Sequence, residues 1–66
     1  MKIKITNKRH LGELQIVFAM LEKQGLRPQN LGHDSIVCEV PNKKWFKSIK
    51  QAVEFMTGCQ VKLEAP

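Results

Sequence analysis

The 66-residue chain is predicted to fold as an α+β domain, and two features of its pattern lead to this prediction. First, short segments that alternate polar and apolar residues, as half-buried strands do, are separated by longer segments with helical periodicity. Second, the sequence nearly repeats itself at an offset of thirty-five positions, so that Asn7 falls on Asn42 and the apolar positions of one helical segment fall on those of the other. The offset predicts a single domain built from two strand–helix–strand halves, at about residues 1–31 and 34–66.

The first half contains one clear strand and one clear helix. Residues 2–6 read Lys-Ile-Lys-Ile-Thr, which has the two-residue period of a strand with one buried face. The pattern from Arg9 to Gln24 changes to helical spacing, for which Asn7 is the candidate N-terminal cap and Gly25 the candidate terminator. At about 100° per residue, the apolar side of this helix consists of Leu11, Leu14, Val17, Phe18 and Leu21.

The rest of the chain contains three further strands and a second helix. Residues 26–31 form a poor strand, because Pro28 has no N–H to donate and is tolerated only at the edge of a sheet. A clear strand follows over residues 35–40, and a second helix, with Asn42 as its candidate cap, runs from about Lys43 to Thr57. Residues 59–64 alternate again and form the last strand.

The resulting order is β-α-β-β-α-β, the split βαβ or ferredoxin-like arrangement. Its four-stranded antiparallel sheet has the spatial order 4-1-3-2, with both helices on one face, and this order places the proline-bearing strand at an edge. Cys38 and Cys59 then lie on strands two spacings apart, about 9.5 Å, which exceeds the roughly 7 Å between the Cα atoms of a disulfide. We therefore expect two buried, free and inert thiols, and no metal site or other cofactor.

The composition limits the possible partners and compartments. The formal net charge is +5 and the pI is about 9.6, which favours nucleic acid or an acidic protein as partner, although solubility alone also explains such a charge. The longest apolar run, Ile16 to Leu21, is far too short to span a membrane, and the alternating N-terminal segment is unlike a signal peptide. We expect a cytoplasmic protein without membrane contact.

The strongest functional signal is a concentration of basic and amide residues where the helices begin. We expect the first and third strands to be parallel neighbours, so that their C-terminal ends and both helix N-termini meet at one basic edge. Acidic residues are expected in neither first turn, and such an edge suits an anion, although these residues could equally be solvated lysines. The predicted binding residues are Asn7, Lys8, Arg9, His10, Asn42, Lys43 and Lys44, extended along the second helix by Lys47 and Lys50.

The helices also carry more apolar residues than one buried stripe needs. Ile16, Met20 and Phe55 lie off the main apolar stripes, and Phe55 is the hardest of them to bury. These three residues are the candidate interface, either with another protein or in a homodimer that uses the second helix or the edge of the fourth strand. Trp45, at the margin of the basic edge, is a candidate for base stacking, although a core anchor is the more common role for a single tryptophan.

The open face of the sheet argues against base stacking, and the carboxylates argue against enzyme activity. The open face is expected to carry mixed charges that pair across strands and no aromatic residue, which disfavours base stacking there. Its expected residues are Lys2, Lys4, Thr6, Val37, Glu39, Gln60, Lys62 and Glu64. The six carboxylates form no recognisable catalytic pair, so we expect no enzyme activity.

We therefore predict a small non-enzymatic module that binds nucleic acid through its phosphates. The alternative is a protein-interaction module, such as a small regulator or inhibitor, that docks an acidic partner.

Overall fold

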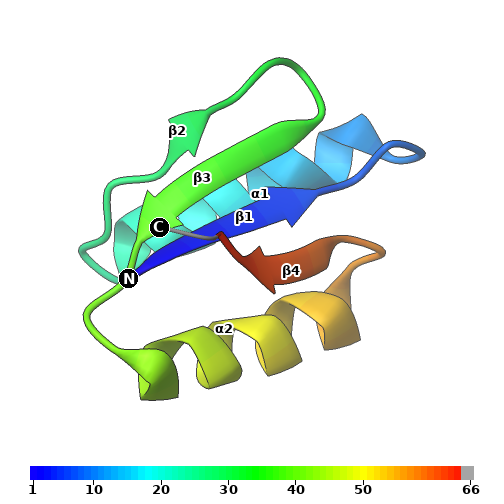
Figure 1. Cartoon of the computed structure of the whole chain (residues 1–66). Helices are drawn as coiled ribbons and strands as arrows, with labels where there is room; N and C mark the ends of the chain where they lie inside the picture. The colour runs from blue at the N-terminus through cyan, green and yellow to red at the C-terminus, as the bar shows by residue number, and fades with distance from the viewer. Residues whose placement is uncertain (65–66) are drawn as a thin grey trace.

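The computed structural model describes residues 1–64 and shows four strands and two helices in the predicted order (Figure 1). The sheet order is β2-β3-β1-β4, every adjacent pair is antiparallel, and this order is the predicted 4-1-3-2 read in the opposite direction. The ferredoxin-like fold is thus confirmed. The elements are β1 (Lys2–Thr6), α1 (Leu11–Lys23), β2 (Gln29–Asn30), β3 (Ser35–Glu39), α2 (Lys43–Met56) and β4 (Gln60–Leu63).

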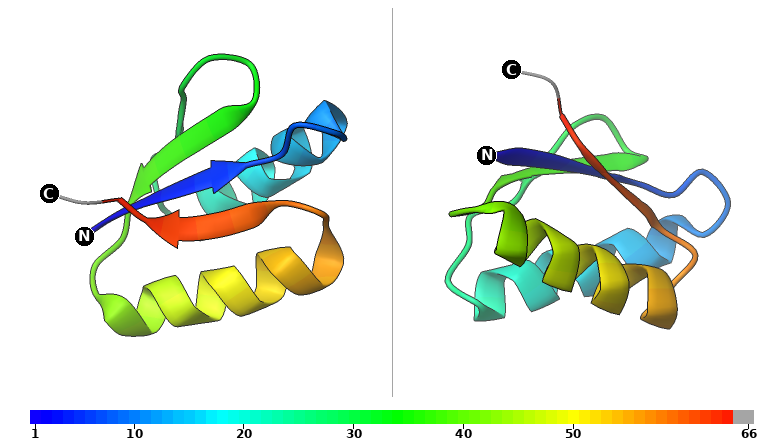
Figure 2. Two further views of the ribbon diagram at one scale, coloured as in Figure 1. Left: turned by 45° about the vertical axis from the view of Figure 1, so that its right-hand side comes forward. Right: turned by 60° about the horizontal axis from the view of Figure 1, so that its bottom comes forward.

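Both helices cover the same face of the sheet and run in opposite directions, as the second view in Figure 2 shows. On this shared face, α2 lies along the edge strand β4, whereas α1 lies across β3, in the other half of the sheet. Because each helix returns the chain to the end where its preceding strand began, the start of α1 and the end of α2 lie at the same end of the molecule.

The core lies between the sheet and the helices. Ile3 and Ile5 of the central strand β1 are fully buried, and the inward residues of β3 and β4 flank them through the strand register. The buried apolar residues are Ile3, Ile5, Leu14, Val17, Leu21, Ile36, Cys38, Val40, Ile49, Val53, Cys59 and Val61. The strand periods therefore predicted the correct inward face.

Two boundaries differ from the sequence prediction. α1 begins at Leu11 instead of Arg9, because the Asn7 side chain binds the backbone N–H groups of Arg9 and His10 and holds them in a turn outside the helix. β2 is confined to Gln29–Asn30 instead of residues 26–31, since the buried Pro28 has no N–H for the ladder. The predicted terminator Gly25 is confirmed, with φ of 82° and with the Leu26 N–H donating to Leu21 O at 3.1 Å.

Leu11, which was predicted to face the core from the first helix, is exposed instead, because it is the first residue of α1. Met56, the last residue of α2, is also exposed. None of the helices within residues 1–64 is long and apolar enough to cross a membrane.

Both thiols are buried and free, as predicted, and β1 separates the strands that carry them. Cys38 lies opposite Ile3 near the start of β1, whereas Cys59 lies beside Asn7 just beyond the other end of that strand. Burial raises the pKa of the Cys38 thiol above its ordinary value, which favours the unreactive protonated form.

Candidate nucleic-acid interface

The single basic edge expected from the sequence does not exist in the structure. β1 and β3 are antiparallel, with Thr6 opposite Ser35 at one end and Lys2 opposite Glu39 at the other. The two helices therefore begin at opposite ends of the sheet, and the predicted binding residues divide into two clusters (Figure 1). The prediction of parallel neighbours was wrong because, in this topology, the strands of each βαβ half are parallel to each other but not adjacent.

Asn7 organises the first cluster, in the loop between β1 and α1. Its Oδ1 accepts from the backbone N–H groups of Arg9 at 3.0 Å and His10 at 2.8 Å. Its Nδ2 donates to Glu13 Oε1 at 2.9 Å and lies 3.5 Å from Cys59 Sγ. Only 5% of Asn7 is exposed, so its amide is a structural clamp and is itself inaccessible to a ligand. Asn7 thus shapes the loop, whereas the N-cap position of α1 is occupied by His10 and not by the predicted Asn7, and the His10 side chain makes no capping hydrogen bond.

Glu13 corrects the expectation that neither helix has an acid in its first turn. Because α1 begins at Leu11, Glu13 is its first-turn acid, and its Oε1 also accepts from the Gly58 N–H at 3.1 Å. The carboxylate therefore joins the start of α1 to the loop that follows α2. It also partly neutralises the positive end of the α1 dipole, so this helix terminus offers less to an external anion than expected.

The side chains of Lys8, Arg9 and His10 are exposed around a surface hollow of ≈ 620 Å³. Besides these residues and Asn7, the hollow is lined by Gly58 and by two residues of the open face of the sheet, Thr6 and Gln60. The loop cations therefore lie at the end of the open sheet face and not on the helix side alone.

The second cluster lies at the start of α2. Asn42 Oδ1 accepts from the Trp45 N–H at 3.2 Å, which confirms Asn42 as the cap of this helix. Lys43 and Lys44 occupy its first turn, which contains no acidic residue, and both are exposed, as is Lys47 one turn later. Trp45 packs against the core and is only partly exposed, so the core-anchor interpretation holds for most of its ring.

Lys50 does not extend this cluster as a free cation. Its Nζ donates to Glu54 Oε2 at 2.8 Å and to the Val61 carbonyl at 3.3 Å, while Glu54 Oε2 accepts from the Val61 N–H at 3.1 Å. The Lys50 ammonium and the hydrogen bond from Val61 lower the pKa of the Glu54 carboxyl. Together the two side chains satisfy the outward backbone groups of Val61, which closes part of the β4 edge to another strand.

Two cations on the open face, Lys4 and Lys62, were expected there but were not among the predicted binding residues. Lys4 of β1 lies directly opposite Lys62 of β4, and its neighbour on the other side is Val37 of β3. The predicted pairing of opposite charges therefore fails at this position, although Lys2 does lie opposite Glu39. Within residues 1–64 neither Lys4 nor Lys62 forms an ion pair. The register of β1 with β4, which period alone does not determine, was the missing information.

These two lysines and the loop cations are separated along the sheet by one uncharged pair, Thr6 and Gln60. Thr6 and Gln60 are the next pair along the same face after Lys4 and Lys62, and they line the hollow that the loop cations surround. We call this the β1–β4 basic surface and define it by Lys4, Lys62, Lys8 and Arg9. Like charges directly opposite each other on adjacent strands repel, so an anion bound between them lowers the energy of this surface.

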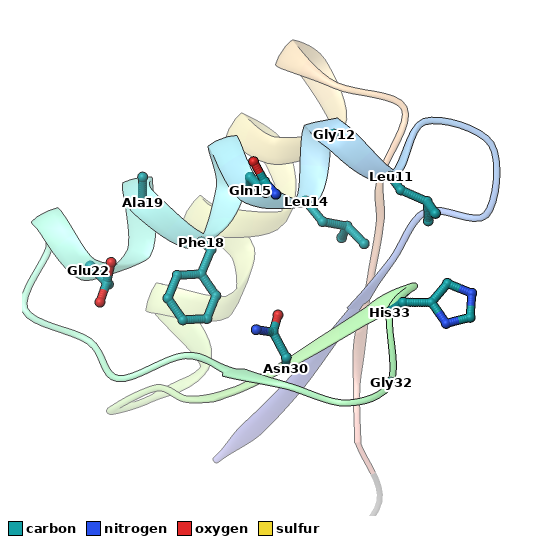
Figure 3. Close-up of a pocket in the computed structure, with 10 residues that line it drawn as sticks. All are labelled: Leu11, Gly12, Leu14, Gln15, Phe18, Ala19, Glu22, Asn30, Gly32 and His33. Carbon is teal, nitrogen blue, oxygen red and sulfur yellow. The ribbon is translucent and has the colours of Figure 1, made fainter.

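A second hollow, also ≈ 620 Å³, lies between α1 and the turn after β2 (Figure 3). It exists because β2 is too short to cover this side of α1. Phe18 points from α1 toward Asn30, whereas the charged or titratable residues Glu22 and His33 stand at opposite ends. Polar groups do not converge in this groove, so its lining indicates no particular chemistry.

The three predicted interface residues lie in the helices. Ile16 and Phe55 are exposed, with 59% and 89% of their surfaces accessible, whereas Met20 is only partly exposed and packs against the core. Packing against the core thus accounts for Met20 but leaves Ile16 exposed.

Within residues 1–64 no group of His, Cys, Asp and Glu side chains is arranged to hold a metal ion. No protein-family model matches the chain, and no curated protein or solved structure matches it either. The function must therefore be argued from the residues and their arrangement.

Proposed function

We propose that this protein is a non-enzymatic module that binds nucleic acid through phosphate contacts on the β1–β4 basic surface. The observation that carries the proposal is the register that places Lys4 opposite Lys62, on the same face as the Lys8–Arg9 loop. Four cations along one face can neutralise successive phosphates and release the counterions condensed on them. The Asn7 clamp holds the loop in place before binding, which reduces the entropy cost of ordering it.

The proposed contacts are to the sugar–phosphate backbone and not to the bases. The open face between residues 2 and 64 contains no aromatic residue on which a base could stack. Base-edge recognition would also require side chains that enter a groove, whereas Lys4 and Lys62 project from a flat strand pair. We therefore expect little sequence preference.

The cluster at the start of α2 has a secondary role in this proposal. Lys43, Lys44 and Lys47 lie at the end of the sheet opposite the Lys8–Arg9 loop. β1 has five residues, so the two ends are separated by about 17 Å at ~3.4 Å per residue. An oligonucleotide of about four nucleotides, about 14 Å long at ~3.4 Å per nucleotide, does not span this separation, whereas a longer one can contact both ends.

The test compares two variants from which the same charge has been removed. The first variant carries Lys4→Gln, Lys62→Gln, Lys8→Gln and Arg9→Gln; the second carries Lys43→Gln, Lys44→Gln, Lys47→Gln and Lys23→Gln. With a single-stranded oligonucleotide of about four nucleotides that carries a 5′-phosphate, we expect the first variant to lose at least about tenfold in affinity and the second to lose much less. Equal losses would show that only net charge matters and would refute the assigned surface.

Two further predictions from the sequence concern the location of the protein and its self-association. The cytoplasm stays the proposed location, where the buried thiols Cys38 and Cys59 would remain reduced. A homodimer through the β4 edge would have to displace the Lys50 and Glu54 side chains from Val61, so a dimer would more readily use α2.

A further inference from the structure

The helix layer carries large apolar side chains that nothing in the described chain covers: Ile16 and Phe55 on the sides of α1 and α2 that face away from the sheet, and Met56 at the end of α2. Phe55 is 89% exposed, Met56 63% and Ile16 59%. They come from different helices, α2 and α1, which lie antiparallel on the same face of the sheet (Figure 2).

These three residues lie at the same end of the helix layer. The Glu13 carboxylate in the first turn of α1 accepts from the Gly58 N–H just after α2, which ties these helix ends together at 3.1 Å. Ile16 is three residues after Glu13, and Phe55 is three residues before Gly58. Each therefore lies about one helical turn from the shared contact, so the exposed apolar side chains are concentrated in one half of the layer.

The other half of the layer is basic. Lys23 follows Ile16 by seven residues, which is close to two helical turns, and Lys44 precedes Phe55 by eleven residues, which is close to three. Each lysine therefore lies on the same exposed side of its helix as the apolar residue. At about 1.5 Å per residue, the lysines lie about 10 and 16 Å from Ile16 and Phe55 along their helices. Because the helices are antiparallel, both lysines are displaced toward the same end, where Lys47 adds a third exposed cation.

Few acidic groups oppose these cations. Of the carboxylates on the two helices, Glu13 is bonded to Asn7 and Gly58, and Glu54 is bonded to Lys50 and Val61. Glu22 lines the groove beneath the turn after β2, on a different side of α1 from Ile16. The outward side of the helix layer is thus apolar at one end and positively charged at the other.

We infer that this face docks an acidic segment of a partner protein, with an apolar side chain of that segment seated against Phe55, Met56 and Ile16 and its carboxylates directed toward Lys23, Lys44 and Lys47. A buried apolar anchor with charged contacts at its rim is the usual construction of a protein interface. None of these residues belongs to the β1–β4 basic surface, whose Lys4 and Lys62 lie on the opposite face of the sheet, so this inference does not rest on nucleic-acid binding.

Two other occupants fit the observations less well. A second copy could cover the apolar half, but its own helix layer carries the same lysines and therefore does not complement the basic half. A membrane-bound helix inserts its apolar side into the lipid, whereas the apolar side of α2, with Ile49 and Val53, is already buried against the sheet.

The test uses a defined probe, a helical peptide of leucine and glutamate with its leucines on one face, and a matched peptide of leucine and lysine. Fluorescence anisotropy of the labelled peptides measures binding to the wild type and two variants, Phe55→Ser/Ile16→Ser and Lys23→Gln/Lys44→Gln/Lys47→Gln. We expect wild type to bind the acidic peptide and not the basic one, and each variant to lose at least about tenfold in affinity. All substituted positions are exposed, so both variants should unfold at the same denaturant concentration as wild type.

The control Lys2→Gln/Lys4→Gln/Lys62→Gln removes three charges from the opposite face and should bind the acidic peptide within about twofold of wild type. Equal binding of both peptides, or unchanged binding in the Phe55→Ser/Ile16→Ser variant, would overturn the inference. So would a wild-type dimer that this variant converts to a monomer, or tighter binding to anionic phosphatidylserine vesicles than to the acidic peptide.

Discussion

Replacing Asn7 and Asn42 separately by alanine tests how the two halves of the chain differ. The near-repeat in the sequence gives both asparagines the same role, and both do accept a hydrogen bond from the N–H three residues later, at 2.8 Å for Asn7 and 3.2 Å for Asn42. Asn7, however, is buried and also binds the Arg9 N–H and the Glu13 carboxylate, whereas the Asn42 contact is exposed.

The expected losses of stability follow from these contacts. Asn7→Ala removes two neutral hydrogen bonds at about 1 kcal/mol each and one bond to a charged group at about 1.5 kcal/mol, so we expect a loss of about 3.5 kcal/mol. Asn42→Ala removes one exposed capping bond and should cost about 1 kcal/mol. A domain of this length has a total unfolding free energy of only about 3–10 kcal/mol, so the first variant should be close to unfolding.

Urea denaturation followed by far-UV circular dichroism measures both variants. With a slope of about 1 kcal/mol per molar urea, the midpoint should fall by about 3.5 M for Asn7→Ala and about 1 M for Asn42→Ala. Equal shifts would contradict the clamp described for Asn7 and would show that both residues act as simple helix caps. Gly58→Ala is a control, because alanine keeps the backbone N–H that donates to Glu13; its midpoint should stay close to that of the wild type.

Other consequences of the structure can be checked with single variants. Because the folded-state pKa of Glu54 is lowered, its contribution to stability is full above the unfolded-state pKa and is lost as the pH falls through the folded-state pKa. Urea titrations from pH 6 to pH 3 should show this loss, which is at most about 0.5 kcal/mol because the Lys50–Glu54 pair is partly exposed. The variant Glu54→Gln should abolish the pH dependence. Cys38 and Cys59 should react with a thiol reagent only as fast as the protein opens, so rapid labelling of the folded protein would contradict their burial. Phe55→Ser should change the unfolding free energy by less than about 0.5 kcal/mol, whereas Ile5→Ala should cost about 2–5 kcal/mol; a large loss in the former would mean that Phe55 is covered.

The sequence was sufficient to predict the fold because its local signals agree with one another. The alternation at Ile3 and Ile5 defines an inward face, and the helical spacing of Val17 and Leu21 defines the side of α1 that packs on it. Pro28 correctly indicated a weak edge strand, since a residue without an N–H cannot extend the ladder. These properties depend on residues near one another in the chain.

The candidate site was predicted less well because it depends on relations between distant segments. Lys8 and Lys43 occupy equivalent positions in the two halves, but the antiparallel pairing of β1 with β3 places them at opposite ends of the sheet. Lys4 and Lys62 form a basic pair only through the β1–β4 register, and Lys50 is withdrawn from the site by Glu54 and Val61. The antiparallel strand directions of the predicted topology are enough to place the two clusters at opposite ends of the sheet. The register between β1 and β4, in contrast, cannot be derived from the pattern of the sequence.

The central claim is that a short nucleic acid contacts the four cations of the β1–β4 basic surface, and its salt dependence tests this claim most directly. For a single strand of about four nucleotides that carries a 5′-phosphate, the slope of log K against log salt concentration should be about −2.8 for wild type, from ~0.7 for each of the four neutralised phosphates. The variant Lys4→Gln/Lys62→Gln/Lys8→Gln/Arg9→Gln should have a slope near zero, whereas the variant Lys23→Gln/Lys43→Gln/Lys44→Gln/Lys47→Gln should keep the wild-type slope. A wild-type slope retained by the first variant and lost by the second would contradict the account.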